Sequence, residues 1–205
     1  MRIERNASYK NHLLNDKKLH SLLSAYPDLK LKKRKNICLY LCASIMSQQL
    51  STKVADIIYA RFLALYDTKE PKAQQIADTP FEKLRAIGLS NAKVSYVQNV
   101  ANYALEHGME DKKLYKMTDE EVMQFLLPIK GVGRWTVEML LMFVLGREDV
   151  FAQDDLGIQQ GMCKLYGIDA TDKKAMKNKM LQISASWSPY RTFACMMIWR
   201  YKDDK

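Results

Sequence analysis

The feature that most constrains the fold is the helical spacing of apolar residues, which runs along almost the whole chain. Glycine and proline are scarce, with 8 and 5 in 205 residues, so the chain has few of the tight turns that a β-sandwich or barrel needs. We therefore expect an all-α protein with roughly ten helices and no strand. The clearest expected helices span residues 36–46, 52–66, 80–87, 90–107, 118–127, 135–145, 155–165, 173–187 and 189–201.

Two of these helices begin with the signature of a capping box, in which a hydroxyl residue is followed three positions later by glutamate. Thr79 precedes Pro80 and Glu82, so we expect Thr79 to cap and Pro80 to occupy the first helical position. Thr118 precedes Glu121 in the same way. Both patterns fix a helix start more firmly than periodicity alone.

The chain is long enough for one sizeable core, or for two small lobes that share one. Hydrophobic residues make up 48% and charged residues 27%, which excludes a disordered or collagen-like chain. Residues 90–119 contain no linker-like composition, so we expect two closely packed, inseparable helical lobes over residues 36–205.

The net charge is +9, and most of it lies in residues 1–35, where ten basic residues accompany three acidic ones. We expect this stretch to be a basic N-terminal segment outside the helical domain, with its main charge cluster at Lys30, Lys32, Lys33, Arg34 and Lys35. A basic chain suggests an anionic partner, with nucleic acid first. A solvated face without such a partner is the alternative.

The cysteines and histidines are too scattered for a metal or iron–sulfur site. Cys38, Cys42, Cys163 and Cys195 each lie among apolar residues, so we expect buried free thiols in a reducing, cytoplasmic setting. We expect no signal peptide and no membrane span, because no apolar run approaches the required length.

The most informative segment is the connection between two helices at residues 129–136, with sequence IKGVGRWT. Its two glycines permit unusual backbone angles and leave no Cβ above the chain. Backbone N–H groups at the start of the next helix then face outward with the positive end of the helix dipole, which suits a phosphate diester. A plain tight turn is the alternative. The expected phosphate-binding residues are Lys130, Gly131, Val132, Gly133, Arg134 and Thr136.

This segment resembles the helix–hairpin–helix of the DNA glycosylase superfamily, and four further stretches match that superfamily in the correct order. They are residues 47–51, 88–93, 149–158 and 187–200, and together they are typical of the 3-methyladenine DNA glycosylase II branch. The resemblance implies an active-site cleft between the two lobes. It does not cover residues 1–35, and we expect the chain to lack the β-rich N-terminal domain of some members.

The resemblance places the catalytic carboxylate at Asp155, at the start of a helix. A carboxylate there stabilises the positive charge that develops on the sugar and orients or deprotonates water. We expect the preceding Asp154 to cap the helix or to support the loop. A structural double cap is the alternative for the pair.

Members that also cleave the DNA backbone carry a lysine nucleophile where this chain has Trp135. The resemblance therefore implies a monofunctional enzyme that uses water, with no lyase step. It implies no iron–sulfur cluster and no other cofactor, although a monovalent cation at the hairpin backbone remains compatible.

The resemblance also suggests how a damaged base is held. Trp135 and Trp199 match pocket aromatics that bind a cationic base by stacking, and Tyr190 and Trp187 are weaker candidates. Leu50 matches the wedge that fills the gap left by a flipped base, with Gln49 as the alternative filler. Core roles for these aromatics and for Leu50 are the competing interpretations.

The sequence thus predicts a base-excision repair glycosylase that removes alkylated purines of the 3-methyladenine or 7-methylguanine type and leaves an abasic site. Its expected partner is double-stranded DNA that contains alkylated bases, and its expected state is a monomer, associated with the nucleoid if bacterial. One alternative is a glycosylase for oxidised or deaminated bases. The other is a helix–hairpin–helix DNA-binding protein without catalysis.

Overall fold

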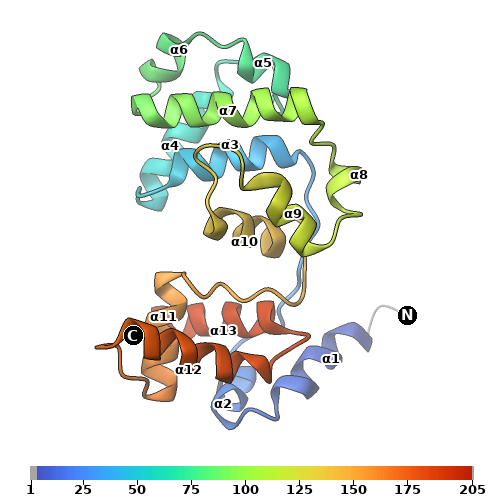
Figure 1. Ribbon diagram of the computed structural model, residues 1–205, viewed down its shortest axis with the longest axis vertical. Coiled ribbons are helices and arrows are strands. Elements are labelled where there is room, and N and C mark those ends of the chain that lie inside the picture. The colour runs from blue at the N-terminus through green and yellow to red at the C-terminus, as the bar shows by residue number, and fades with distance from the viewer. Residues whose placement is uncertain (1–3, 205) are drawn as a thin grey trace. The chain divides into compact units, whose positions relative to one another are not determined.

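The computed structural model describes residues 4–204 of the protein, and over that range it contains thirteen helices and no strand (Figure 1). The all-α class is therefore confirmed. The helices are α1 (Glu4–Leu13), α2 (Lys17–Ala25), α3 (Ile37–Ser47), α4 (Thr52–Leu63), α5 (Ala73–Ala77), α6 (Phe81–Ala86), α7 (Asn91–His107), α8 (Asp111–Leu114), α9 (Asp119–Leu126), α10 (Arg134–Phe143), α11 (Leu156–Tyr166), α12 (Lys173–Ala185) and α13 (Arg191–Asp203). Within the described range, no helix is long and apolar enough to cross a membrane.

The chain divides into two compact units. Unit 1 combines the described residues up to Lys32 with those from Leu141 onward, and unit 2 is the continuous stretch Lys33–Leu140. The boundary falls within α10.

Unit 1 contains the N-terminal helices, which pack with the C-terminal ones (Figure 1). Tyr9 of α1 stacks on Phe193 of α13 with ring centroids 4.2 Å apart, and α2 also contacts α13. The Tyr9 hydroxyl accepts the N–H of Leu29 at 3.0 Å. The expectation of a basic segment outside the domain is therefore wrong for most of residues 8–29. Lysines between the buried leucines obscured the amphipathic pattern.

Asp16 ties the N-terminal part of unit 1 to its C-terminal part. Its Oδ1 caps α2 by accepting the N–H groups of Lys18 and Leu19 at 2.9 and 3.2 Å. Its Oδ2 accepts the Tyr166 hydroxyl at 2.8 Å and the Trp187 Nε1–H at 2.9 Å. Burial, and then the neighbouring carboxylate, raise the pKa of Tyr166.

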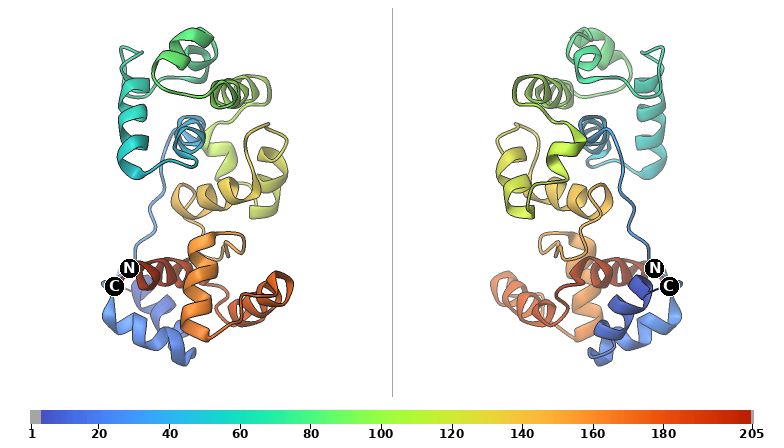
Figure 2. Two further views of the ribbon diagram at one scale, coloured as in Figure 1. Left: turned by 90° about the vertical axis from the view of Figure 1, so that its left-hand side faces the viewer. Right: turned by 90° about the vertical axis from the view of Figure 1, so that its right-hand side faces the viewer.

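Unit 2 is organised around α7, which packs against α3, α5 and α6. Figure 2 views α3 and α7 nearly end-on and side by side. Ser90 caps α7, and Asn36 caps α3 in a left-handed conformation. The Asp111 carboxylate adds to the start of α3 by accepting the N–H groups of Asn36 and Ile37 at 2.9 and 3.1 Å.

One of the two expected capping boxes forms. Thr118 accepts the Glu121 N–H at 3.2 Å, and the Glu121 carboxylate accepts the Thr118 N–H at 2.7 Å. The other expectation is wrong, because Pro80 occupies the cap of α6 without a side-chain bond. The hydroxyl of Thr79 instead donates to the Gln75 carbonyl at 2.7 Å and lies 2.9 Å from the Tyr66 hydroxyl.

Candidate active site and DNA interface

The connection between α9 and α10 is a tight hairpin in unit 2. The Val132 N–H donates to the Ile129 carbonyl at 2.9 Å, and Gly131 adopts φ 106°, a left-handed conformation. A Cβ at Gly131 would lie 2.4 Å from Cγ of Tyr96, so only glycine fits between the turn and α7. The Asn99 side chain supports the turn by donating to the Lys130 carbonyl at 3.2 Å.

The outer side of the hairpin is open. A Cβ at Gly133 would meet no atom within 4 Å, and Lys130 and Arg134 are exposed. Among the described residues, neither the Gly131 nor the Gly133 N–H donates a hydrogen bond. Open N–H groups at the N-terminus of a helix are a chemical arrangement that can bind an anion.

The side chains of two expected phosphate-binding residues point elsewhere. Thr136 is 2% exposed and Val132 is 6% exposed, so both side chains belong to the core of unit 2. Arg134 is held by an ion pair in which its Nε lies 3.0 Å from Oε1 of buried Glu138. Lys130 and Arg134 therefore carry the accessible positive charge of the hairpin.

The expected wedge lies in the turn between α3 and α4, also in unit 2. Gln49 has φ 60° and is exposed, and Leu50 is half-buried. Gln48 Nε2 donates to the Gly131 carbonyl at 3.5 Å, which connects this turn to the hairpin. Ser51 then caps α4 through the Val54 N–H.

Asp155 lies in unit 1, at the N-cap of α11. Its Oδ1 accepts the Ile158 N–H at 2.8 Å and the Trp199 Nε1–H at 2.7 Å. These two donors therefore hold the carboxylate in one orientation at the start of α11. Of the two expected roles of Asp154, capping this helix is wrong, because Asp155 is the cap. Asp154 instead pairs with Lys177 of α12, whose Nζ lies 2.6 Å from Oδ1.

Gly157 allows the contact between Asp155 and Trp199, a role that was not predicted from the sequence. A Cβ at position 157 would lie 2.8 Å from Cδ1 of Trp199 and 3.1 Å from Oδ1 of Asp155. Any side chain here would therefore push the indole away from the carboxylate. Gly157 lies in the 149–158 stretch that resembles the superfamily, but the need for glycine there comes from Trp199 of α13, which is distant in sequence.

The loop that leads to Asp155 is fastened to the start of α13. Arg191 donates to Asp149 through Nε and Nη2 at 2.7 and 2.9 Å, and the Ser188 hydroxyl adds a bond of 2.8 Å. Burial alone would raise the pKa of Asp149, but these donors outweigh it and lower the pKa.

A second anchor of the same loop is Thr192, whose hydroxyl accepts the Val150 N–H and donates to the Arg147 carbonyl. The 187–192 motif thus anchors the loop.

The four candidate pocket aromatics have different surroundings. Trp199 and Tyr190 are half-buried in unit 1, and the Tyr190 hydroxyl bonds the Ser8 hydroxyl. Trp135 lies on α10 and is 39% exposed. Trp187 is 0% exposed and bonds Asp16, so it is a core residue of unit 1 with no face for a base.

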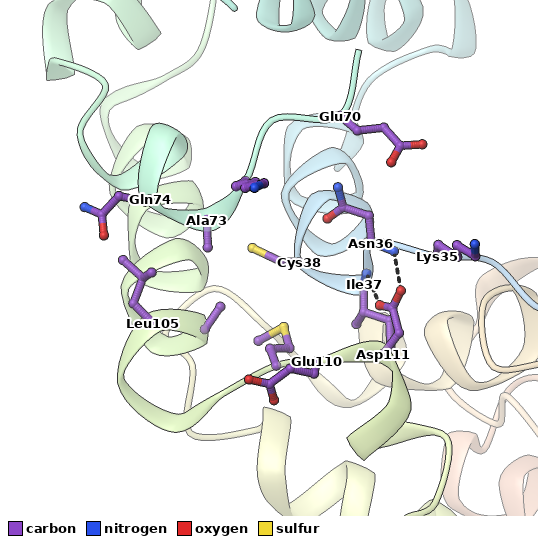
Figure 3. Close-up of a pocket in the computed structure, with 13 residues that line it drawn as sticks. Lys35, Asn36, Ile37, Cys38, Glu70, Ala73, Gln74, Leu105, Glu110 and Asp111 are labelled. Carbon is purple, nitrogen blue, oxygen red and sulfur yellow. Dashed lines mark hydrogen bonds between the residues drawn. The ribbon is translucent and has the colours of Figure 1, made fainter. Parts of the chain in front are cut away.

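Unit 2 also contains an open cavity of about 650 Å³, drawn in Figure 3. It lies beside the start of α3 and includes Lys35, Cys38, Glu70 and Leu105 in its lining. None of the expected site residues lines it. Over the described residues, no group of three His, Cys, Asp or Glu side chains is arranged to hold a metal ion.

Comparison with known proteins assigns the family. The model for the HhH-GPD superfamily of base excision DNA repair proteins matches residues 42–185. DNA-3-methyladenine glycosylase 1 of Schizosaccharomyces pombe is 34% identical over 188 residues, which cover 91% of this chain and 81% of the relative. The chain therefore belongs to the HhH-GPD superfamily of base excision DNA repair proteins.

Two solved structures of similar sequence have the same fold and support the same family assignment. The DNA-3-methyladenine glycosidase of Bacillus halodurans matches with a TM-score of 0.83 and 32% identity, covering 95% of this chain and 88% of that one. The S. pombe 3-methyladenine DNA glycosylase in complex with abasic DNA matches with a TM-score of 0.82 and 30% identity, covering 94% and 95%. These relatives confirm the branch that the sequence motifs resemble.

Proposed function

We propose that the protein is a monofunctional DNA glycosylase that hydrolyses the N-glycosidic bond of alkylated purines in double-stranded DNA and leaves an abasic site. The observation that carries the proposal is Asp155, whose carboxylate is fixed by two N–H donors at the start of α11 in a chain of this family. The names of its relatives support the alkylated-purine class.

The chemistry follows from the charge on the substrate. When the bond between the sugar and an N3- or N7-alkylated purine breaks, both bonding electrons leave with the base, which becomes neutral. The sugar acquires the positive charge, and the Asp155 carboxylate stabilises it. Water then bonds to the anomeric carbon and gives up a proton to the Asp155 carboxylate, which releases it to solvent. Because a cationic base leaves readily, the reaction needs no cofactor.

Trp199 has two roles in this proposal. Its Nε1–H orients Asp155, and its half-buried ring offers a π face to a cationic base. Tyr190, also half-buried, and Trp135, on α10, are proposed as further aromatic contacts. The hairpin binds the DNA backbone through Lys130, Arg134 and the N–H groups of Gly131 and Gly133, and the enzyme acts as a monomer.

The test is the release of bases from a panel of duplexes that carry 3-methyladenine, 7-methylguanine, 8-oxoguanine or uracil. The proposal expects release of the methylated purines, an alkali-labile but unbroken strand, no covalent adduct after borohydride, and full activity in EDTA. Preferential release of 8-oxoguanine or uracil would identify another glycosylase. DNA binding without release of any base would identify a non-enzymatic binding protein.

A further inference from the structure

Lys93 has an unusual position for a lysine in the first turn of a helix. It is the third residue of α7, where the helix dipole disfavours a positive charge. Its half-buried ammonium leaves α7 and donates to two carbonyls at the end of α3, that of Met46 at 2.9 Å and that of Gln48 at 2.7 Å. Burial lowers its pKa. Lys93 therefore stabilises the end of α3 and not its own helix.

These carbonyls belong to the turn that carries the expected wedge. The last carbonyls of a helix lack partners within the helix, and a cation there complements the dipole. Immediately after Gln48 the chain enters a left-handed conformation at Gln49, which is rare for a residue with a side chain, and then reaches Leu50. A charged donor that holds Gln48 therefore holds the start of this strained turn.

The same turn is connected to the hairpin. The Gln48 main chain accepts from Lys93, while its side chain donates to the Gly131 carbonyl at 3.5 Å. Gly131 in turn rests on Tyr96, one helical turn after Lys93 on α7. The first turns of α7 thus support both DNA-facing features of unit 2.

From this geometry we infer that Lys93 is a positioning residue for the wedge: it holds residues 48–50 so that Leu50 is presented to the base stack while a paired lesion is extruded. The inference rests on the proposed function. Lys93 acts through the turn, because two of its three ammonium N–H groups are donated to carbonyls within the protein.

The test compares Lys93→Met, which keeps the unbranched side chain to within one atom of its length and removes the donor, with Lys93→Arg and with a control, Lys83→Met, at an exposed lysine on α6. The single-turnover rate of excision is measured for one methylated purine in two duplexes, one in which it is paired and one in which it lies opposite an abasic site. Lys93→Met should slow the paired substrate about tenfold and the unpaired one less than about threefold, because wedging matters only against pairing and stacking. Lys93→Arg should recover most of the rate, and Lys83→Met should match the parent protein.

A double-mutant cycle with Leu50→Ala separates positioning from general damage. Leu50→Ala alone should show the same preference for the unpaired substrate, and adding Lys93→Met should cost little more, because both changes remove one function. Equal slowing on both substrates, or additive losses in the cycle, would overturn the inference. A flatter salt dependence of duplex binding in Lys93→Met would also overturn it, because Lys93 would then contact a phosphate.

Amide exchange keeps the inference testable apart from the proposed function. Lys93→Met should raise hydrogen exchange at residues 48–51 and leave the exchange of α9 and α10 unchanged. If the parent protein released no methylated base, the proposed function would fail. Faster exchange at residues 48–51 in Lys93→Met would even then show that Lys93 stabilises this turn. Unchanged exchange there would overturn the role of Lys93.

Discussion

At the scale of single residues, the two glycines of the hairpin have different roles. Gly131 has φ 106° and is pressed against Tyr96, so it is required by the fold of unit 2. A Cβ at Gly133 would meet nothing within 4 Å, so the fold requires only that the Gly133 carbonyl accept the Val137 N–H at the start of α10. Its open space is the feature expected where a DNA backbone approaches closely.

Gly131→Leu and Gly133→Leu should therefore separate stability from binding. Gly131→Leu should lower the melting temperature markedly, because the side chain clashes with Tyr96 at a left-handed position. Gly133→Leu should cost less than about 1 kcal/mol, the scale of a changed N-cap, yet weaken duplex binding about tenfold or more. Thermal melts measure the change in stability, and fluorescence anisotropy measures the affinity for duplex DNA. Equal losses of stability and binding in Gly133→Leu would favour a plain turn.

At the scale of elements, Asp16 shows how α2 is fastened to unit 1. It caps α2 and also accepts from Tyr166 and Trp187, whereas Asp172 only caps α12, accepting the N–H groups of Lys174 and Ala175. Asp172 is therefore a suitable control for Asp16, because both residues cap a helix but only Asp16 also accepts hydrogen bonds from Tyr166 and Trp187.

Asp172→Ala should lower the free energy of unfolding by about 1 kcal/mol, the usual cost of a lost N-cap. Asp16→Ala should lower it by about 3 kcal/mol or more, because two further donors lose their partner in the interior. Urea unfolding of the two variants in parallel measures the difference. Similar losses would show that the bonds to Tyr166 and Trp187 contribute nothing beyond the cap.

The elements also show what a sequence can predict. Long periodic helices and the Thr118 capping box were predictable because their signals are local. Helices α5 and α8 are too short to show a period, and α1 and α2 lie in a lysine-rich stretch. In the site, the hairpin was evident from its glycines. The role of Gly157, the anchor between Asp149 and Arg191 and the pairing of Asp154 with Lys177 depend on contacts between distant segments.

At the scale of the whole molecule, the positive charge is distributed over several elements. The cluster Lys30, Lys32, Lys33, Arg34 and Lys35 is exposed throughout and joins α2 to α3. Its backbone is held at Arg34, whose carbonyl accepts the Tyr115 hydroxyl. The Lys33 ammonium lies over the Tyr115 ring, 5.1 Å from its centroid, and the other side chains of the cluster extend the exposed positive charge.

Affinity for undamaged duplex should therefore fall steeply between 50 and 200 mM salt, by about 0.9 in log–log slope for each phosphate contacted. Lys130→Ala should reduce the slope by about 1, and replacing Lys30, Lys32, Lys33 and Lys35 by glutamine should reduce it further. Lys83→Ala provides a control outside the assigned surface. Anisotropy titrations over this salt range measure each slope, and salt-independent binding would refute the electrostatic interface.

The central claim is that the Asp155 carboxylate carries the reaction. In Asp155→Asn the amide oxygen still accepts the Ile158 and Trp199 N–H groups, so the fold and DNA binding should persist while the negative charge is lost. Asp154→Asn removes only an exposed pair with Lys177, which contributes little.

The deciding measurement is the single-turnover rate of 3-methyladenine excision by these two variants side by side. The account predicts a loss of about 10²–10³-fold for Asp155→Asn and less than about threefold for Asp154→Asn. Full activity in Asp155→Asn, or a larger loss in Asp154→Asn, would contradict the mechanism.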